Sequence, residues 1–325
     1  MASMREVAER AGVGIGTVSR YLNGTGYVSE ETGSKINAAI KELDYTPNEL
    51  ARNLFKMSTN IVAIIVPDLS HPFFSEFARY AESELYGWGY KTMVCNTINK
   101  SNREKEYLEM LKRRMVDGII TGVHSLDIEE YLKVSQPIIA LDRYIGENIP
   151  LIGCNHNKGG ELAAGKFIQS KCRYVVQVQG ATSVNTPAHD RHTTLESVLR
   201  REGIHVETKE LLWNRFDYDY FEKIADEILD EYPQIDGMFG SDLAVSAVLK
   251  RALERGIRVP EDLKLVAYDG TYLSKAVYPP MTVIAQPIEE LAKKAVELIL
   301  ELIKGNKNIP DKTILEVSLQ EGKTT

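Results

Sequence analysis

Apolar residues in the first 46 positions recur at helical spacing in three short groups. A Ser-x-x-Glu capping box at residues 3–6 predicts a helix that starts near residue 4 and ends at Gly12. After a glycine turn, a second helix carries IGTVSRYL, with Val18 and Leu22 four apart on its buried face. The segment VSEETGSKINAAIKEL is the third helix. The first two helices have the pattern of a helix-turn-helix, whose second helix fits the DNA major groove, although many helical hairpins share it.

From Asn60 onward the pattern changes to short apolar runs that alternate with amphipathic segments. The first set is IVAIIV, 73–87, KTMVC, 103–115, DGIIT, 127–133 and PIIALD, and the second is GGELAAGKFIQ, YVVQVQG, 189–202, 217–230, GMFGSD, 243–255 and LKLVAYDG. This βαβ rhythm is typical of parallel sheets covered on both faces. We therefore predict an α/β body with two lobes of doubly wound parallel sheet. Ligands are expected in the crevice outside the carboxyl ends of the strands.

A connector, YTPNELARNLFKMST, joins the two parts. Pro47 ends the preceding helix, and Asn48 can cap a new helix that runs to about Lys56. A helix this short is not stable alone in water. The connector is therefore either a switch that is helical only when something holds it or an ordinary tether. The predicted division is 1–46 for the helical headpiece, 47–59 for the hinge helix and linker, and 60–325 for the body.

Composition and charge are compatible with both a DNA-binding headpiece and a globular body. The chain has 325 residues, 43% hydrophobic and 26% charged, which is typical of an ordinary globular protein with two or three domains. A net charge of -7 argues against nucleic-acid binding. Residues 1–57, however, contain seven Lys and Arg and seven Asp and Glu, so the negative charge lies downstream.

Cys95, Cys154 and Cys172 are scattered without a CxxC spacing, and we expect buried free thiols rather than a disulfide framework or a zinc site. The longest apolar run, IVAIIV, is far shorter than a membrane span, and the N-terminus lacks the layout of a signal peptide. We expect a cytoplasmic protein without a membrane partner.

Charged and aromatic residues follow the predicted strands. They are Asp68, Ser70, His71, Phe73, Phe74, Asp142, Arg143, Arg191, Ser241, Asp242 and Asp269. Any single Asp at a strand end can simply cap the next helix. Carboxylates, an arginine and aromatic faces at one cleft, taken together, suit a polyhydroxylated ligand, and a sugar fits best.

The sequence disfavours two other functions. An enzyme is disfavoured because the chain has no GxSxG, P-loop, HExxH, or GxGxxG opening a helix. HDRH at 189–192 is interpreted as a helix start that carries Arg191 rather than a metal site. A transport-type sugar-binding protein would need a signal peptide and no headpiece. No cofactor and no metal are expected.

The segments VAERAGVGIGTVSRYLNG, YVSEET, YTPN and LARNL resemble, in order and spacing, the headpiece and hinge helix of the LacI/GalR bacterial repressors. The resemblance implies a recognition helix that presents Ile15, Gly16, Thr17, Ser19 and Arg20 to DNA. Arg20 is the expected base reader, since Arg can bind guanine bidentately. The resemblance also implies phosphate contacts from Asn23, Tyr27, Ser29 and Asn48 and insertion into the minor groove at Ala51 and Leu54. Three glycines depart from the family pattern: Gly14 at the helix cap, Gly16 at an operator-choosing position, and Gly33 in place of a basic residue.

The body resembles the same family through VPDLSHPFF, DGII, LDR, NKGGELAA, RVPEDLKLVAYDGT and YPPMTVIAQP, so the resemblance covers essentially the whole chain. It implies a fold like that of periplasmic sugar-binding proteins, crossed three times between lobes. The implied lobes are about 60–156 with 287–312, and about 157–286 with 313–325. GYKTMVCNT, REKEYLEML and AYDGTYL are most similar to the sucrose-operon repressor subgroup, and Phe216 matches a position that often carries an aromatic ring over the sugar.

The sequence thus predicts a cytoplasmic homodimeric repressor of carbohydrate-utilisation genes. Its expected partners are a palindromic double-stranded DNA operator, a second copy of the chain and a sugar or sugar-phosphate effector. The predicted effector-binding residues are His71, Phe73, Phe74, Asp142, Arg191, Phe216, Ser241, Asp242 and Asp269.

Overall fold

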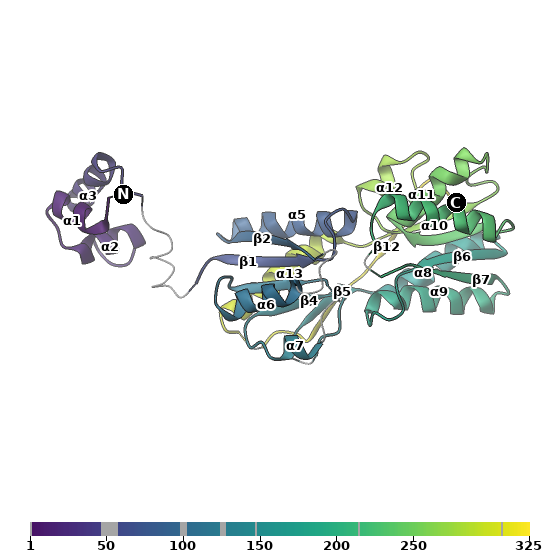
Figure 1. Cartoon of the computed structure of the whole chain (residues 1–325), viewed down its shortest axis with the longest axis horizontal. Coiled ribbons are helices and arrows are strands. Elements are labelled where there is room, and N and C mark those ends of the chain that lie inside the picture. The colour runs from purple at the N-terminus through teal and green to yellow at the C-terminus, as the bar shows by residue number, and fades with distance from the viewer. Residues whose placement is uncertain are drawn as a thin grey trace. The chain divides into compact units, whose positions relative to one another are not determined.

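A computed structural model describes residues 2–46, 58–97, 103–123, 128–146, 148–213, 215–306 and 308–325. The chain separates into two compact units, Met1–Thr59 and Asn60–Thr325 (Figure 1). The division falls where the hydrophobic pattern changes. The predicted hinge helix at about 48–56 lies outside the described residues. Within the described ranges, no helix is both long enough and apolar enough to cross a membrane.

The first unit contains the three helices that the pattern predicts, α1 (Met4–Ala11), α2 (Ile15–Asn23) and α3 (Glu30–Glu42). The predicted capping box is present, since Ser3 Oγ accepts from the Glu6 amide and Glu6 Oε2 accepts from the Ser3 amide at 2.7 Å. Helix α1 ends at Gly12, which has a left-handed φ of 67°. The core that holds the three helices together is formed by Val7, Ala8, Ala11, Val18, Ile36, Ala39 and Tyr45. Because helices of this length are marginal alone, this shared core supplies their stability.

The second unit begins with the first lobe, a sheet in the order β11-β5-β4-β3-β1-β2 whose paired strands are all parallel. Its elements are β1 (Ile61–Val66), α5 (Pro72–Gly87), β2 (Lys91–Asn96), α6 (Arg103–Lys112), β3 (Gly118–Thr121), α7 (Ile128–Leu132), β4 (Ile138–Leu141), β5 (Leu151–Cys154), α13 (Ile288–Ile303) and β11 (Lys312–Leu315). Strand β1 is buried on both faces. Val62 and Ile64 pack on the side of α5 and α13, and Ala63 and Ile65 pack on the side of α6. The continuous apolar run IVAIIV follows from this double burial.

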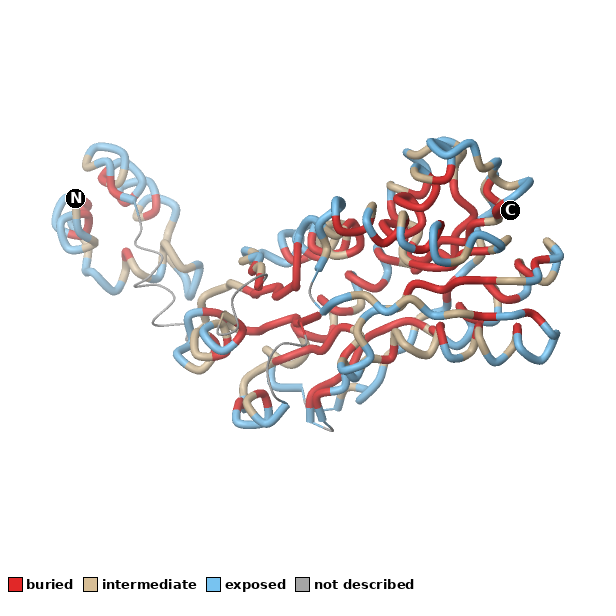
Figure 2. Tube along the Cα trace, turned by 45° about the vertical axis from the view of Figure 1, so that its right-hand side comes forward, coloured by how far each residue is buried: buried red, intermediate tan, exposed pale blue. Residues whose placement is uncertain are grey.

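The second lobe has a sheet in the order β12-β10-β9-β8-β6-β7, parallel except that β12 runs antiparallel to β10. Its elements are α8 (His156–Gln169), β6 (Tyr174–Gln179), the short turn η1 (Pro187–His189), α9 (Asp190–Arg201), β7 (His205–Glu210), α10 (Tyr218–Glu231), β8 (Gly237–Ser241), α11 (Asp242–Glu254), β9 (Lys264–Asp269), α12 (Tyr272–Ala276), β10 (Thr282–Ala285) and β12 (Ser318–Gln320). Helices α8 and α9 cover one face and α10 and α11 the other, and the inner strands β6, β8, β9 and β10 are largely buried (Figures 1 and 2).

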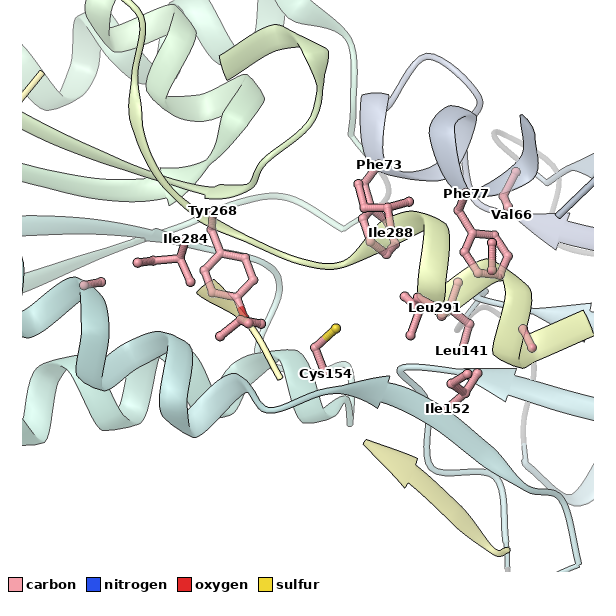
Figure 3. Packing of buried hydrophobic residues seen from close by; sticks show 14 of the residues in the cluster. Val66, Phe73, Phe77, Leu141, Ile152, Cys154, Tyr268, Ile284, Ile288 and Leu291 are labelled. Atoms are coloured by element: carbon pink, nitrogen blue, oxygen red, sulfur yellow. The ribbon is translucent and has the colours of Figure 1, made fainter. Parts of the chain in front are cut away.

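The chain crosses between the lobes three times, after β5, after β10 and after β11. The boundary expected at 312 needs correction, because residues 312–315 form β11 and pair in parallel with β5 in the first sheet. One apolar cluster runs through the crossings (Figure 3). It joins Phe77 and Leu291 of the first lobe to Tyr268 and Ile284 of the second. The three cysteines are free and buried, as predicted.

Candidate functional site

The first candidate surface is the exposed side of α2. Val18 is fully buried, whereas Ile15 is 48% exposed and Arg20 is exposed. Arg20 Nε donates to the Gly16 carbonyl at 3.2 Å, and Arg20 forms no ion pair within residues 2–46. Thr17 and Ser19 are partly exposed on the same helix. The predicted base-reading residues therefore remain available to a partner while the opposite side of the helix forms the core.

The three glycines that depart from the family pattern have different surroundings. Gly14 caps α2 without a side-chain hydrogen bond, and a Cβ at Gly16 would meet nothing within 4 Å. At Gly33, a Cβ would lie 2.8 Å from Cε2 of Tyr21, whose hydroxyl accepts from Asn37 at 2.5 Å. Gly33 thus leaves room for the Tyr21 ring, which gives a packing reason for the absence of a larger residue.

The predicted phosphate contacts are partly placed. Tyr27 is 90% exposed, and Asn23 Nδ2 donates to Ser19 Oγ at 3.3 Å. Ser29 caps α3, since its Oγ accepts from the Thr32 amide at 3.3 Å. Three predicted DNA contacts, Asn48, Ala51 and Leu54, lie outside the described residues.

The second candidate site is a cavity of about 220 Å³ within the body, at the carboxyl ends of the strands of both lobes. Eight of the nine predicted effector residues line it: His71, Phe73, Phe74, Asp142, Arg191, Phe216, Ser241 and Asp269. The topology therefore brings together residues that are scattered over the sequence, as parallel sheets do at their carboxyl edges.

Aromatic rings from both lobes meet at one wall of the cavity. The His71 ring contacts the edges of Phe74 and Phe216, with centroids 5.4 Å away in both cases. Burial, together with the Arg191 charge, lowers the pKa of His71 to about 4, so its imidazole is neutral at pH 7. The wall is apolar apart from the imidazole nitrogens.

Asp142 has two hydrogen-bonding partners, and the residue that follows it is anchored as well. His156 Nε2 lies 3.1 Å from its Oδ1, and Thr186 Oγ1, from the second lobe, donates to its backbone carbonyl at 2.7 Å. The next residue, Arg143, is buried and donates to Glu104 at 2.8 Å. Asp142 also has a left-handed φ of 48°, uncommon for a residue with a side chain. These contacts fix the carboxylate at the junction of the lobes.

Arg191 is positioned by a relay of side chains. Its guanidinium lies over the Tyr268 ring, 4.3 Å from the centroid, and its Nε donates to His192 Nε2 at 3.2 Å. His192 Nδ1 lies 3.0 Å from Gln177 Oε1, which can only accept, so Nδ1 carries the proton. Burial lowers the pKa of His192 well below its usual value. A neutral His192 therefore orients Arg191 without repelling it.

Asp269 is buried at the end of β9, where its Oδ1 accepts from Gln286 Nε2 at 2.9 Å. Burial raises the pKa of Asp269 to about 6, and the nearby Arg191 charge opposes that rise. The carboxyl group is therefore mostly ionised at pH 7. Its φ of 119° is a left-handed value, and such backbone strain is frequent at binding sites.

Asp242 does not line the cavity, which departs from the prediction. Its carboxylate accepts from the Thr271 amide at 2.7 Å, from the Thr271 hydroxyl at 2.6 Å and from the Gly270 amide at 3.4 Å. These bonds turn both oxygens toward the loop after β9. Asp242 therefore fixes the loop that follows Asp269 rather than facing a ligand.

The cavity is also lined by polar residues that were not among the predicted effector-binding residues. They are Thr186, His189, His192, Arg215 and Gln286. The dipeptide Gln286-Pro287 after the apolar run TVIA was a usable signal, since it marks a strand end facing the same edge. His192 and Thr186 gave no periodic signal because their roles depend on contacts distant in sequence.

Comparison with known proteins places both units. The family model "Bacterial regulatory proteins, lacI family" matches residues 3–48, and the model "Periplasmic binding protein-like domain" matches residues 164–325. The sucrose operon repressor of Streptococcus mutans is 37% identical and covers 100% of this chain and 99% of its own. The ribose operon repressor of Halalkalibacterium halodurans is 33% identical, with the same coverage.

Solved structures agree over the same length. The lac repressor dimer bound to operator and the anti-inducer ONPF has a TM-score of 0.87 at 25% identity, covering 99% of this chain and 98% of that one. The complex of the transcriptional regulator CelR with cellobiose has a TM-score of 0.71 at 26% identity, covering 100% of both chains.

Proposed function

This chain belongs to the LacI family of bacterial regulatory proteins, and from that premise we propose that it represses carbohydrate-utilisation genes under the control of a sugar or sugar-phosphate effector. The relatives named above are repressors, which supports a cavity that binds its ligand without catalysis. The protein acts in the cytoplasm, where its operator DNA lies.

The DNA-binding part of the proposal rests on the exposed side of α2. Arg20 reads a base pair in the major groove, Thr17 and Ser19 contact neighbouring base edges, and Asn23, Tyr27 and Ser29 contact phosphates. One headpiece covers only a half-site. The active form is therefore a homodimer on a palindromic operator.

The effector part rests on one observation: aromatic rings and charged groups from both lobes line the same cavity, with Asp142 and Arg191 on opposite sides of the lobe junction. Arg191 and Asp269 bind effector hydroxyls, and Phe74 and Phe216 cover the apolar face of the ligand. A ligand that touches both lobes stabilises one arrangement of them and so alters the headpieces.

The hinge completes the proposal. Two hinge helices at about 48–56 pair across the dimer on DNA, and each Leu54 wedges into a central base step through the minor groove. Movement of the first lobes separates the hinges, and the helices then melt. The segment is a switch because a helix this short needs a partner.

Selection of double-stranded DNA from a random pool by the full-length protein tests the DNA-binding half, and should recover a palindrome. A thermal-shift screen of the full-length protein against sugars and sugar phosphates tests the effector half, since a ligand bound only by the folded state raises the melting temperature. Recovery of unrelated DNA sequences would contradict the proposed binding to a palindromic operator. An unchanged melting temperature with every carbohydrate would contradict the proposed sugar effector.

A further inference from the structure

We propose that the effector is an uncharged sugar with a single ring, and that the cavity rejects the phosphorylated form of the same sugar. This inference rests on the proposed function, because it takes the cavity lined by Asp142, Arg191 and Asp269 to be the effector site.

The charged groups that line the cavity leave one unpaired cation for a phosphate. Its acids are Asp142 and Asp269, and its guanidinium groups are those of Arg191 and Arg215. Arg215 is already paired, with Nε 2.9 Å from Asp217 Oδ2. A phosphate dianion would thus meet two carboxylates and one unpaired guanidinium, in a setting where burial strengthens like-charge repulsion.

The three histidines that line the cavity do not supply the missing positive charge. Burial is the largest cause of a lowered pKa at His71, His189 and His192, and the Arg191 charge lowers all three further. All three imidazoles are therefore neutral at pH 7 and add no positive charge to the cavity.

The hydrogen-bonding groups call for a ligand that donates. Gln286 is 7% exposed, and its Nε2 donates to Asp269, which fixes the amide orientation. Sugar hydroxyls can donate to the carboxylates of Asp142 and Asp269 while they accept from Arg191, whereas a phosphate dianion only accepts.

One feature of the cavity favours an anionic ligand. Phe73 and Phe74 form part of the first turn of α5, and a helix N-terminus attracts anions with about half a unit of positive charge. Pro72 at the start of that helix has no amide hydrogen to offer. Half a charge, added to the guanidinium of Arg191, does not balance the two carboxylates of Asp142 and Asp269.

The size of the cavity limits the number of sugar rings in the ligand. Its volume of about 220 Å³ lies below the roughly 300–1,000 Å³ of sites for drug-sized ligands. A site smaller than that range favours a ligand with one sugar ring over a ligand with two.

The test compares matched pairs on the full-length protein by calorimetry: fructose with fructose 6-phosphate, glucose with glucose 6-phosphate, ribose with ribose 5-phosphate, and sucrose with sucrose 6-phosphate. We expect at least one monosaccharide to bind at least tenfold more tightly than its phosphate. Tighter binding of a phosphorylated member, or binding of sucrose alone, would overturn the inference and leave the proposed function intact. Failure of every carbohydrate by a protein that still binds its operator would instead overturn the proposed effector, and this inference with it.

Variants that remove a negative charge test whether the carboxylates of Asp142 and Asp269 cause the rejection of the phosphorylated sugar. In Asp142→Asn and Asp269→Asn an oxygen still accepts from His156 or Gln286, but the negative charge is gone. We expect the preference for the unphosphorylated sugar to fall about tenfold in each variant. Glu161→Gln, an equal change of charge on the exposed surface of α8, is the matched control and should leave the preference unchanged. An equal change in this preference in all three variants would show that the charges of Asp142 and Asp269 do not set it.

Discussion

The Nε2 atom of His156 lies 3.1 Å from Oδ1 of Asp142, so the first residue of the crossover helix α8 holds a carboxylate of the first lobe. The other ring nitrogen, Nδ1, lies 2.8 Å from the hydroxyl of Tyr268 in the second lobe. Burial raises the pKa of Tyr268, which keeps that hydroxyl protonated. The Tyr268 hydroxyl can therefore donate to Nδ1 while Nε2 donates to Asp142, and one buried imidazole joins the two lobes behind the cavity.

Replacement of this imidazole should affect both stability and ligand binding. His156→Ala leaves the buried Tyr268 hydroxyl without its partner, and we expect the free energy of unfolding to fall by about 1–3 kcal/mol. Effector affinity should also fall, because Asp142 loses the donor that orients it. Urea titration and calorimetry measure the two effects. His205→Ala, at an exposed histidine paired with Glu207, is the control, and an equal loss in both variants would contradict the bridging role.

Effector binding should depend on pH through Asp269. The pKa of this carboxyl group is raised from an unfolded value of about 3.9 to about 6 by burial. Only about a tenth of the folded protein has an ionised Asp269 at pH 5, so an effector that needs the carboxylate should bind about tenfold more weakly there than at pH 7.5. Calorimetry of the wild type and of Asp269→Asn at both pH values measures the effect. A variant that keeps the full pH dependence would assign the dependence to another group.

The same pKa fixes the sign of a stability effect. Because the folded-state value is raised, Asp269 contributes stability that is fully present below about pH 4 and is lost as the pH rises through about 6. Asp269→Asn should therefore be more stable than the wild type at pH 7.5 and lose this advantage toward pH 4. Thermal unfolding without ligand at the two pH values gives the comparison. A constant difference in stability would contradict the shift.

Replacement of Gly16 on α2 should show that this helix is less stable than its surroundings would allow. A Cβ at Gly16 meets nothing within 4 Å, so Gly16→Ala should stabilise the helix by up to about 1 kcal/mol. Slower amide hydrogen exchange across α2 in the full-length protein would report it. Gly12→Ala is the matched control, since its φ of 67° strains any side chain and the exchange should become faster. Faster exchange in Gly16→Ala would show that the helix has no room at this position.

Arg20 should determine sequence preference more than overall affinity for DNA. Arg20→Ala should cost about 1–3 kcal/mol on the operator and relax the preference at one symmetric base pair. Fluorescence anisotropy on the operator and on random DNA separates the two effects. Arg5→Ala removes an equal charge from α1, where Arg5 pairs with Glu9, and serves as the comparison. Equal losses on both DNAs would refute base reading by Arg20.

Much of the fold was readable because its elements obey simple periods. IVAIIV predicts a strand buried on both faces, and the structure places Val62 and Ala63 on opposite sides of β1. Strand β7 was not predicted, because its sequence HVETKE is mostly polar. It lies at the edge of the second sheet, where β6 is its paired neighbour. Edge strands need little apolar sequence, so a search for apolar runs passes over them.

The candidate site was less readable than the fold. Strand ends could be located, which brought Asp142 and Asp269 into the prediction. Asp242 follows β8 directly, as Asp142 follows β4, but its carboxylate turns toward a loop instead. Which way a carboxylate turns depends on amide donors nearly thirty residues away, and a single sequence does not display them. Gln286 acquires its role from a hydrogen bond to Asp269.

A sugar bound in the body should change the affinity of the headpieces for DNA, and operator affinity measured with and without the bound sugar shows whether it does. The protein is titrated into fluorescently labelled operator, first alone and then at a saturating concentration of the sugar that binds in calorimetry. We expect the operator Kd to change by about 5- to 150-fold, and the sugar affinity to change by the same factor when operator is bound. An operator Kd that stays the same with the cavity saturated would contradict it.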